Sequence, residues 1–337
     1  MMHIAIDLGS GKSQVCVRQA DGEITEEGLH PTNRLGLRLK RYPPSRVILE
    51  TCSEAFVVAD AALAAGHDVR IVPATLVRTL GVGSRGVKTD KKDARVLSEV
   101  SCRIELPSVH LPSQMSRNLK AILTLRDCMV ASRTKLINSV RGYLRTQLVK
   151  PKTGSSRTFP ERARVALESS PDGMPLAVDR LLTIIDSLNE QILAATKELD
   201  LLAKEDPTCV RLMTAPGVST ISALRFLAAI DDVGRFPTAS AVRSYLGLTP
   251  GEHSSSQRQR KTSITKAGPS KVRWTLCQAC WSAWRSRPQD PLVQWASKLA
   301  ERRGKGIAII ALARKLAGIL YAIWRDGTTY TPEKFSM

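Results

Sequence analysis

The chain has 337 residues, enough for two or three domains with buried cores. Lysine and arginine outnumber aspartate and glutamate 50 to 31, which gives a formal net charge of +19 and a pI near 10.0. This excess favours a polyanionic partner, above all nucleic acid. The seven cysteines are scattered and odd in number, which argues against a disulfide-stapled secreted domain.

Two features that could suggest a membrane or a zinc site have simpler explanations. The apolar stretch 306–324 carries Arg314 and Lys315 at its middle, where two charges in a bilayer would be costly. We therefore expect a packed amphipathic helix, no membrane partner and a cytoplasmic protein, since no signal-peptide pattern is visible. Cys277 and Cys280 form a lone CxxC without a second pair or a nearby histidine, so we interpret them as helix packing.

The N-terminal elements predict an α/β domain. Residues 3–29 indicate three antiparallel strands joined by Gly-Ser and Asp-Gly turns. Residues 46–77 then indicate strand, helix and strand, with Gly66 ending the helix and Pro73 ending the strand. A meander followed by alternating helices and parallel strands predicts a mixed sheet in the order of ribonuclease-H-like folds, with a helix over 87–100 next.

Two long helices with opposite charge follow. Residues 114–148 have a helical pattern, and between 103 and 157 there are eleven basic residues and only two acidic ones, which favours phosphate contact. Residues 151–160 are typical of a linker. Between 172 and 206 acids outnumber bases eight to three. In that segment a heptad seam runs through Leu181, Ile185, Leu188, Ile192, Ala195, Leu199 and Leu202.

The seam fits either an intramolecular helix pair or a self-associating coiled coil, and we favour self-association. Further along, Pro216, Gly217 and Val218 separate two helical patterns and resemble a helix-hairpin-helix, whose amides could face a phosphate. Ordinary helix packing is the alternative. From 253 to 289 there are eight basic residues and no acid, so we expect a polar, positive loop at the start of this stretch.

Four carboxylates stand where this fold would bring them together. Asp7 and Glu50 each end a hydrophobic strand, and sites in open α/β sheets form at such ends. Asp90 and Asp93 are three residues apart on a helix and share one side. Clustered carboxylates repel unless cations neutralise them, and two hard divalent ions can clamp a phosphodiester. Taken singly, each acid would be interpreted as a cap or a salt-bridge partner.

An ATPase is the alternative at the first strand, because IDLGSGKS is similar to the first phosphate loop of actin-like and Hsp70-like ATPases. Those proteins need a second phosphate hairpin and an adenosine pocket, and neither is found in the sequence. The ATPase interpretation also leaves KTDKKDA without a role.

The motifs together resemble one family. IAIDLGSGKS, VILE, VRIVPATLVRTL and VKTDKKDAR look like the RuvC-like half of the DEDD transposases, the group with the Piv DNA invertase and the bridge-RNA-guided insertion-sequence recombinases. LMTAPGVSTISALRFLAAID, RFPTASAVRSYLGLTPGEHSS, SITKAGPSKVRW and RRGKGIAIIALARKLAGILYAIW match the C-terminal transposase domain in the same order. We therefore expect a RuvC-like domain at 1–158, a linker and acidic coiled coil at 159–206, and a mostly helical transposase domain at 207–337.

The resemblance implies roles for individual residues. Asp7, Glu50, Asp90 and Asp93 would bind Mg²⁺, with Mn²⁺ as an alternative, and a serine in the loop after GLTP would be the nucleophile. The family typically has two serines and then a glycine there, and we assign Ser255, with Ser254 next. Ser256 departs from the pattern by taking the place of the usual glycine. The basic residues expected to contact nucleic acid are Arg126, Arg133, Arg141, Arg145, Arg258, Arg260, Lys261, Lys266, Lys271 and Arg273.

The sequence thus predicts an insertion-sequence transposase that cuts and rejoins DNA through a metal-assisted serine. The resemblance further implies a dimer or tetramer and, in the guided branch of the family, a structured noncoding RNA. The alternatives are a RuvC-like structure-specific endonuclease, a DNA invertase without an RNA guide, and an architectural DNA-binding protein without enzymatic activity.

Overall fold

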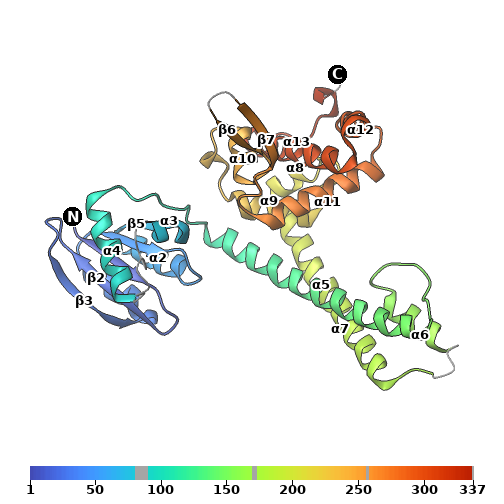
Figure 1. Ribbon diagram of the computed structural model, residues 1–337, viewed down its shortest axis with the longest axis horizontal. Helices are drawn as coiled ribbons and strands as arrows, with labels where there is room; N and C mark the ends of the chain where they lie inside the picture. The colour runs from blue at the N-terminus through green and yellow to red at the C-terminus, as the bar shows by residue number, and fades with distance from the viewer. Residues whose placement is uncertain (80–89, 169–172, 256–257, 336–337) are drawn as a thin grey trace. The chain divides into compact units, whose positions relative to one another are not determined.

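The structure is a computed structural model, and Figure 1 shows its course from the N-terminus to the C-terminus. It describes residues 1–79, 90–168, 173–255 and 258–335, except the side chains of 77–79, 90, 253–255, 258–261 and 334–335. The contacts divide the chain into two compact units, Met1–Pro112 and Ser113–Met337.

The first unit is built on a five-stranded mixed sheet of order β3-β2-β1-β4-β5. Its strands are β1 (His3–Asp7), β2 (Lys12–Arg18), β3 (Ile24–Pro31), β4 (Arg46–Glu50) and β5 (Asp68–Val72). The first three strands are antiparallel, whereas β4 runs parallel to both β1 and β5. The predicted meander and the mixed sheet are therefore confirmed.

Alternation along the strands gives the sheet two apolar faces. Ile4 and Ile6 pack with the helices of one face, α1 (Leu35–Leu39) and α2 (Ala55–Ala64). Ala5 packs on the other face with Leu97 of α4 (Asp90–Arg103), and the short helix α3 (Ala74–Thr79) lies on this side. Successive strand residues point to opposite faces, so Asp7 belongs to the face that α4 covers.

The second unit is mainly helical. Its elements are α5 (Gln114–Thr146), α6 (Phe159–Glu168), α7 (Leu176–Glu205), α8 (Pro207–Leu212), α9 (Thr220–Ile230), α10 (Ala239–Tyr245), β6 (Pro250–Ser255), β7 (Arg258–Ile264), α11 (Ser270–Ser286), α12 (Pro291–Arg303) and α13 (Lys305–Asp326). The described residues also include short 3₁₀ turns at Thr32–Arg34 in the first unit and at Val233–Arg235 and Pro332–Phe335 in the second.

The helices α5 and α7 form an antiparallel pair inside the chain. Arg126 Nε donates to Thr196 Oγ1 at 2.9 Å, and one heptad further Arg133 Nη1 donates to Asn189 Oδ1 at 2.9 Å. At the far end of this pair, α6 buries Phe159 against both helices. The intramolecular pair, which was the alternative for the acidic seam, is therefore present.

The α5–α7 pair buries only some of the predicted heptad positions on α7. Ile185, Ile192 and Leu199 are buried, whereas Leu202 is 42% exposed and Leu188 is half-buried. The other buried positions of α7 are Val178, Leu182 and Ala203. The buried stripe thus follows an ordinary helical face rather than the whole predicted heptad.

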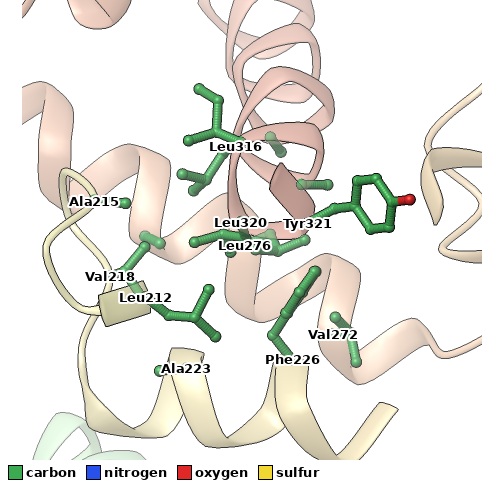
Figure 2. Close-up of a cluster of buried hydrophobic side chains, with 14 of the residues drawn as sticks. Leu212, Ala215, Val218, Ala223, Phe226, Val272, Leu276, Leu316, Leu320 and Tyr321 are labelled. Carbon is green, nitrogen blue, oxygen red and sulfur yellow. The ribbon is translucent and has the colours of Figure 1, made fainter. Parts of the chain in front are cut away.

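The core of the second unit surrounds α13. Leu316 and Leu320 are buried against α8, α9 and α11, and Tyr321 donates its hydroxyl to Phe236 O at 2.7 Å (Figure 2). By length and composition α13 could cross a membrane, since its mean hydropathy over an 18-residue window is 1.8. Its apolar side chains instead form this core, so the predicted packed amphipathic helix is confirmed.

A buried ion pair attaches α5 to this core. Arg225 of α9 is 6% exposed and donates from Nη1 and Nη2 to the two carboxylate oxygens of Asp127, each at 2.9 Å. Burial alone would raise the pKa of Asp127, but the hydrogen bonds and charge of Arg225, with Lys271, outweigh it and hold that pKa below its ordinary value. The charged pair fixes where the long helix leaves the core.

Two local expectations change in the structure. The predicted loop after GLTP is the antiparallel hairpin β6–β7, in which Ser255 is the register partner of Arg258. The hairpin at Gly217 has φ +73° and lies against the backbone of α11 at Ala279, so helix packing accounts for its glycine. The contacts also group α5 with the second unit. The predicted boundaries at 158 and 206 stay predictions.

Replacing Asp127 with asparagine should destabilise the second unit by about 3 kcal/mol, because it leaves the buried Arg225 without its charged partner. All five tryptophans lie in this unit, so urea unfolding followed by tryptophan fluorescence measures the change. Lys271→Met is the matched control, since Lys271 is 71% exposed and lies 3.6 Å from the same carboxylate. Its effect should stay within about 1 kcal/mol. Equal effects of the two substitutions would contradict a buried pair.

Candidate metal and nucleic-acid site

Asp7 and Glu50 end neighbouring strands. The parallel register pairs Ala5 with Ile48 and Ile6 with Leu49, so the next residue on each strand is one of these two acids. Adjacent strands lie about 4.8 Å apart, which places the two Cα atoms side by side. Ala5 and Ile48 both belong to the face covered by α4, and alternation puts Asp7 and Glu50 on that face too.

The helix α4 crosses this face antiparallel to β1. The Nδ1 atom of His3 lies 2.8 Å from Ser101 Oγ, and the next contact along the strand joins Ala5 and Leu97. From one contact to the next, the strand advances by two residues, or about 6.6 Å, and the helix by four residues, or about 6 Å. The two elements therefore stay in step. Continued by one more step, the same spacing would bring Asp7 opposite Asp93, which is 3% exposed.

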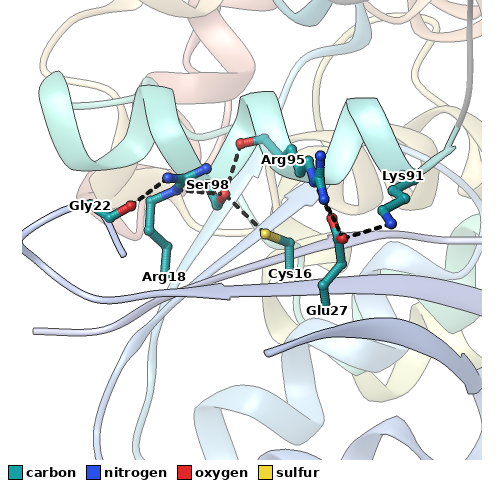
Figure 3. A network of polar contacts seen from close by, with 7 residues as sticks. All are labelled: Cys16, Arg18, Gly22, Glu27, Lys91, Arg95 and Ser98. Carbon is teal, nitrogen blue, oxygen red and sulfur yellow. Dashed lines mark hydrogen bonds and ion pairs between the residues drawn. The ribbon is translucent and has the colours of Figure 1, made fainter. Parts of the chain in front are cut away.

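Polar contacts hold α4 in this register (Figure 3). Glu27 of β3 pairs with Arg95 through two hydrogen bonds and with Lys91 at 3.0 Å. The hydrogen bond from Arg95 lowers the pKa of Glu27 below its ordinary value against the opposing effect of burial, and Lys91 adds to that lowering. The bases in KTDKKDAR that contact β3 therefore anchor the helix that carries the acids.

A second contact group fixes the middle of the helix. Ser98 Oγ lies 3.4 Å from Cys16 Sγ and accepts from Arg18 Nε at 3.2 Å, while Arg18 also donates to Gly22 O at 2.6 Å. Figure 3 shows these residues beneath one face of α4. Strand β2 thus prevents α4 from sliding along the sheet.

The turns beyond the two strand-end acids are also braced. After Asp7, Gly9 O accepts from Thr32 Oγ1 at 2.6 Å, and the Thr32 and Ser13 hydroxyls lie 2.7 Å apart. After Glu50, Thr51 donates from both N and Oγ1 to Val72 O, at 3.0 and 2.9 Å. In the phosphate-loop alternative Ser13 would face a nucleotide, whereas here its hydroxyl is part of the turn.

The strand register places Asp7 and Glu50 at neighbouring strand ends, and α4, which begins at Asp90 and carries Asp93, packs on the same face of the sheet. Among the side chains that the structure describes, which leave out that of Asp90, no three His, Cys, Asp or Glu residues form a group that could hold a metal. Backbone register and the hard oxygen donors that divalent ions prefer are what favour a metal site here. That donor set fits Mg²⁺ or Mn²⁺.

The predicted serines fall in the other unit. Ser254 and Ser255 lie on strand β6, opposite Gln259 and Arg258 of β7. Their side chains, those of Arg258, Arg260 and Lys261, and the whole of Ser256 lie outside the described residues. The acids and the serines thus belong to different compact units of the chain.

Several basic residues predicted to contact nucleic acid make contacts within the chain. Arg126 and Arg133 join α5 to α7, and burial lowers the pKa of both guanidinium groups. Arg273 Nη1 donates to three carbonyls, at Leu246, Ala267 and Gly268, and so ties the loop before α11 to α10. Arg141 stacks over Phe159, at 5.3 Å from the ring centroid, and Lys271 adds to the Asp127 pair.

The sequence reasoning missed the residues that position α4. Glu27, Ser98 and Ser101 carry no recognisable motif, and an isolated serine or glutamate is ordinary on a helix or an edge strand. One signal was available, because Leu97 and Ser101 continue the helical spacing of Asp90 and Asp93. Extending that stripe would have predicted the face of α4 that meets the sheet.

Comparison with known proteins identifies the family. A family model described as a transposase, of the DEDD type of the IS110 group, matches residues 4–148, and the model described as Transposase IS116/IS110/IS902 family matches residues 209–293. The transposase for insertion sequence element IS1111A of Coxiella burnetii is 31% identical over 249 residues, which cover 72% of this chain and 68% of that protein. The chain belongs to the IS110/IS116/IS902 family of insertion-sequence transposases.

A second relative spans the whole length. The transposase for insertion sequence element IS1328 of Yersinia enterocolitica is 26% identical over 338 residues, which cover 97% of this transposase and 98% of the relative. Family membership implies that the transposase acts on DNA by cutting or recombining it, and DEDD-type transposases in general use divalent metal ions. The resemblance inferred from the motifs is therefore confirmed, as is the RuvC-like fold class.

Substituting asparagine for Asp93 should lower metal-dependent DNA strand cleavage by at least about 100-fold, because metal charge at a phosphoryl oxygen contributes several kcal/mol and each 1.36 kcal/mol is tenfold. Cleavage of end-labelled DNA and calorimetric titration with Mg²⁺ would measure the two effects. Glu99→Gln is the control, since Glu99 lies on the same helix, is 43% exposed and pairs with Arg103. Asp93→Asn with wild-type cleavage and wild-type Mg²⁺ binding would exclude Asp93 from the site.

Proposed function

We propose that this transposase cuts and rejoins DNA through a serine nucleophile that acts with a metal-binding acidic quartet. Asp7, Glu50, Asp90 and Asp93 would hold Mg²⁺ or Mn²⁺, and Ser255, or failing it Ser254, would attack. The observation that supports the proposal is the register that ends β1 and β4 side by side at Asp7 and Glu50, on the face of the sheet that α4 covers. Membership of the transposase family indicates that the substrate is DNA.

The serine hydroxyl forms the new bond. Its oxygen attacks the phosphorus of a DNA phosphodiester, its proton leaves to a base, and the bond from phosphorus to the 3′ oxygen breaks with protonation of that oxygen. The product is a phosphoserine joined to one DNA end. Attack by the 3′ hydroxyl of another strand reverses these changes, so exchange needs no external energy source.

The carboxylates and the bases have different tasks in this scheme. A bound divalent ion would supply Lewis-acid charge at the phosphoryl oxygens. The basic residues of β7, Arg258, Arg260 and Lys261, lie on the strand paired with the serines and offset negative charge that develops on the phosphate. Because acids and serines lie in different units, the complete site requires both units, from one chain or from two.

A guide RNA is part of the proposal. The exposed face of α5 retains basic side chains that the pairing with α7 does not bury, namely Lys120, Lys135, Arg141 and Arg145. Such a face suits the backbone of a structured RNA, whose base pairing with DNA would then select the target. With only 4% aromatic residues, the protein is poorly equipped to read bases by extensive stacking.

Self-association through α7 is also proposed. On the edge of α7 beside its buried face, Ile184 is 48% exposed and Leu202 is 42% exposed, with Leu188 and Ala195 half-buried between them at helical spacing. A second copy could cover this stripe and produce the dimer or tetramer expected from the resemblance. The assembly would act in the cytoplasm.

Ser255→Ala should abolish the covalent protein–DNA adduct and leave DNA binding within about twofold, because the hydroxyl contributes to bond making and not to phosphate contact. Denaturing gels of a labelled DNA substrate detect the adduct, and fluorescence anisotropy measures binding. Ser254→Ala is the matched control on the same strand. An adduct lost only in Ser254→Ala would move the nucleophile by one residue. Cleavage that persists in both variants would favour the structure-specific endonuclease.

Nucleic acid that co-purifies with the full-length transposase should include a discrete structured RNA. Nuclease protection followed by sequencing would identify it, and a charge-reduced variant, Lys135→Gln with Arg145→Gln, should retain less of it because both bases are exposed on α5. Random DNA fragments without a recurrent RNA would contradict guidance and favour an invertase that reads duplex DNA directly.

A further inference from the structure

Three cations gather between α10 and α13 without a balancing acid. Arg243 lies on α10, and Arg314 and Lys315 lie on α13, all three partly buried. Among the residues that the structure describes, none of the three has a carboxylate at ion-pair distance. The sequence gives the reason, since α10 has no acid and Asp326, which pairs with Arg325, is the sole acid of α13.

The guanidinium of Arg243 lies directly on the backbone of α13. A Cβ atom added at Gly318 would come within 2.8 Å of Arg243 Cζ, so an alanine there would push the guanidinium away. Glycine weakens the interior of a helix relative to alanine, and here it makes room for a cation. Arg314 is four residues before Gly318, one helical turn away on the same side.

The electrostatics of the three groups are unfavourable without a ligand. Burial lowers the pKa of Arg243, and the charge of Arg314 lowers it further. Burial likewise lowers the pKa of Lys315, and the charge of Arg243 adds to that effect. The buried Nε of Arg243 has no hydrogen-bond partner among the described residues. Lys315 is held over the ring of Trp295, 3.8 Å from its centroid, by a cation–π contact that leaves its charge uncompensated.

Neighbouring like charges that are partly buried reduce the stability of the folded protein. An anion that binds between them offsets this cost. We propose that Arg243, Arg314 and Lys315 form a phosphate-binding site that holds one phosphodiester of a nucleic acid strand. A guanidinium offers a planar fork of donors for phosphate oxygens, and the ammonium of Lys315 adds a point charge. None of these three residues was among the nucleic-acid contacts predicted from the sequence.

The residue Arg243 lies close in the chain to the β6–β7 hairpin, which carries the serines. The carbonyl of Arg243 accepts from Leu248 N at 2.9 Å, within the turn that leads into β6 at Pro250. A strand held by Arg243 is therefore bound beside the base of the hairpin that carries Ser254 and Ser255. The site deepens the proposed function and rests on it, because it would hold the backbone of a strand that the transposase processes.

The test measures binding of the full-length transposase in EDTA, so that no cleavage is required. Arg243→Gln and Lys315→Gln should each weaken binding of a 30-base-pair DNA duplex about tenfold, the loss expected for one charge-assisted hydrogen-bonding group. Each should also reduce the slope of log affinity against log salt by about one. Lys197→Gln is the matched control, since it removes one charge from the acidic helix α7.

Fluorescence anisotropy at several salt concentrations gives both quantities, and tryptophan fluorescence on heating verifies folding. Should Arg243→Gln fail to fold, Lys315→Gln decides the result. The same measurement with an RNA duplex of matching sequence shows whether the phosphate belongs to DNA or to RNA. Weaker binding of either duplex by the variants supports the site. Unchanged affinity and slope in both variants, or an equal loss in Lys197→Gln, would overturn the site and leave the proposed function intact. A wild-type transposase that binds neither duplex would overturn both proposals.

Discussion

The alignment of α4 on β1 is the constraint on which the acidic site depends. Two of its carboxylates end adjacent strands and two lie on a helix some forty residues further along the chain, so sequence proximity cannot bring them together. The alignment does, through the contact of His3 with Ser101 and the packing of Ala5 against Leu97. A shift of β1 by one residue against its neighbouring strands would turn Asp7 to the face of α1 and α2. The pairing of Glu27 with Arg95 opposes a different change, a slide of α4 along the sheet.

The positive charge of the transposase is used in three different ways. Some cations stabilise the fold through a buried or clamped partner, as Arg225 does with Asp127. Others tie loops or helices to each other by donating to neutral oxygens, as Arg273 does with three carbonyls. The cluster around Arg243 has neither kind of partner. The net positive charge therefore predicts that the ligand is an anion. The cations that lack a partner within the described part of the protein indicate where that anion would bind.

The sequence predicted most of the first unit, because strand alternation and Gly or Pro stops are local signals that tertiary contacts did not override. It placed Asp7 and Glu50 at strand ends correctly for the same reason. It failed where a loop and a hairpin have the same composition, because the polar stretch after Pro250 forms the antiparallel pair β6–β7. It also could not separate Arg126, which joins two helices, from a phosphate contact, since an arginine's partner is set by packing.

The pairing of α5 with α7 connects these observations. Arg126 and Arg133, one heptad apart on α5, both donate to α7, and the opposite face of α5 keeps its bases exposed. The acidic helix α7 thus packs against the apolar face of the basic helix α5 and leaves the positive charges on the outer face of α5 without a partner in α7. The proposed acids and serines meanwhile occupy different units, so neither unit contains all of the residues that we propose to react. If both sets are required, strand cutting would depend on bringing the two units together on nucleic acid.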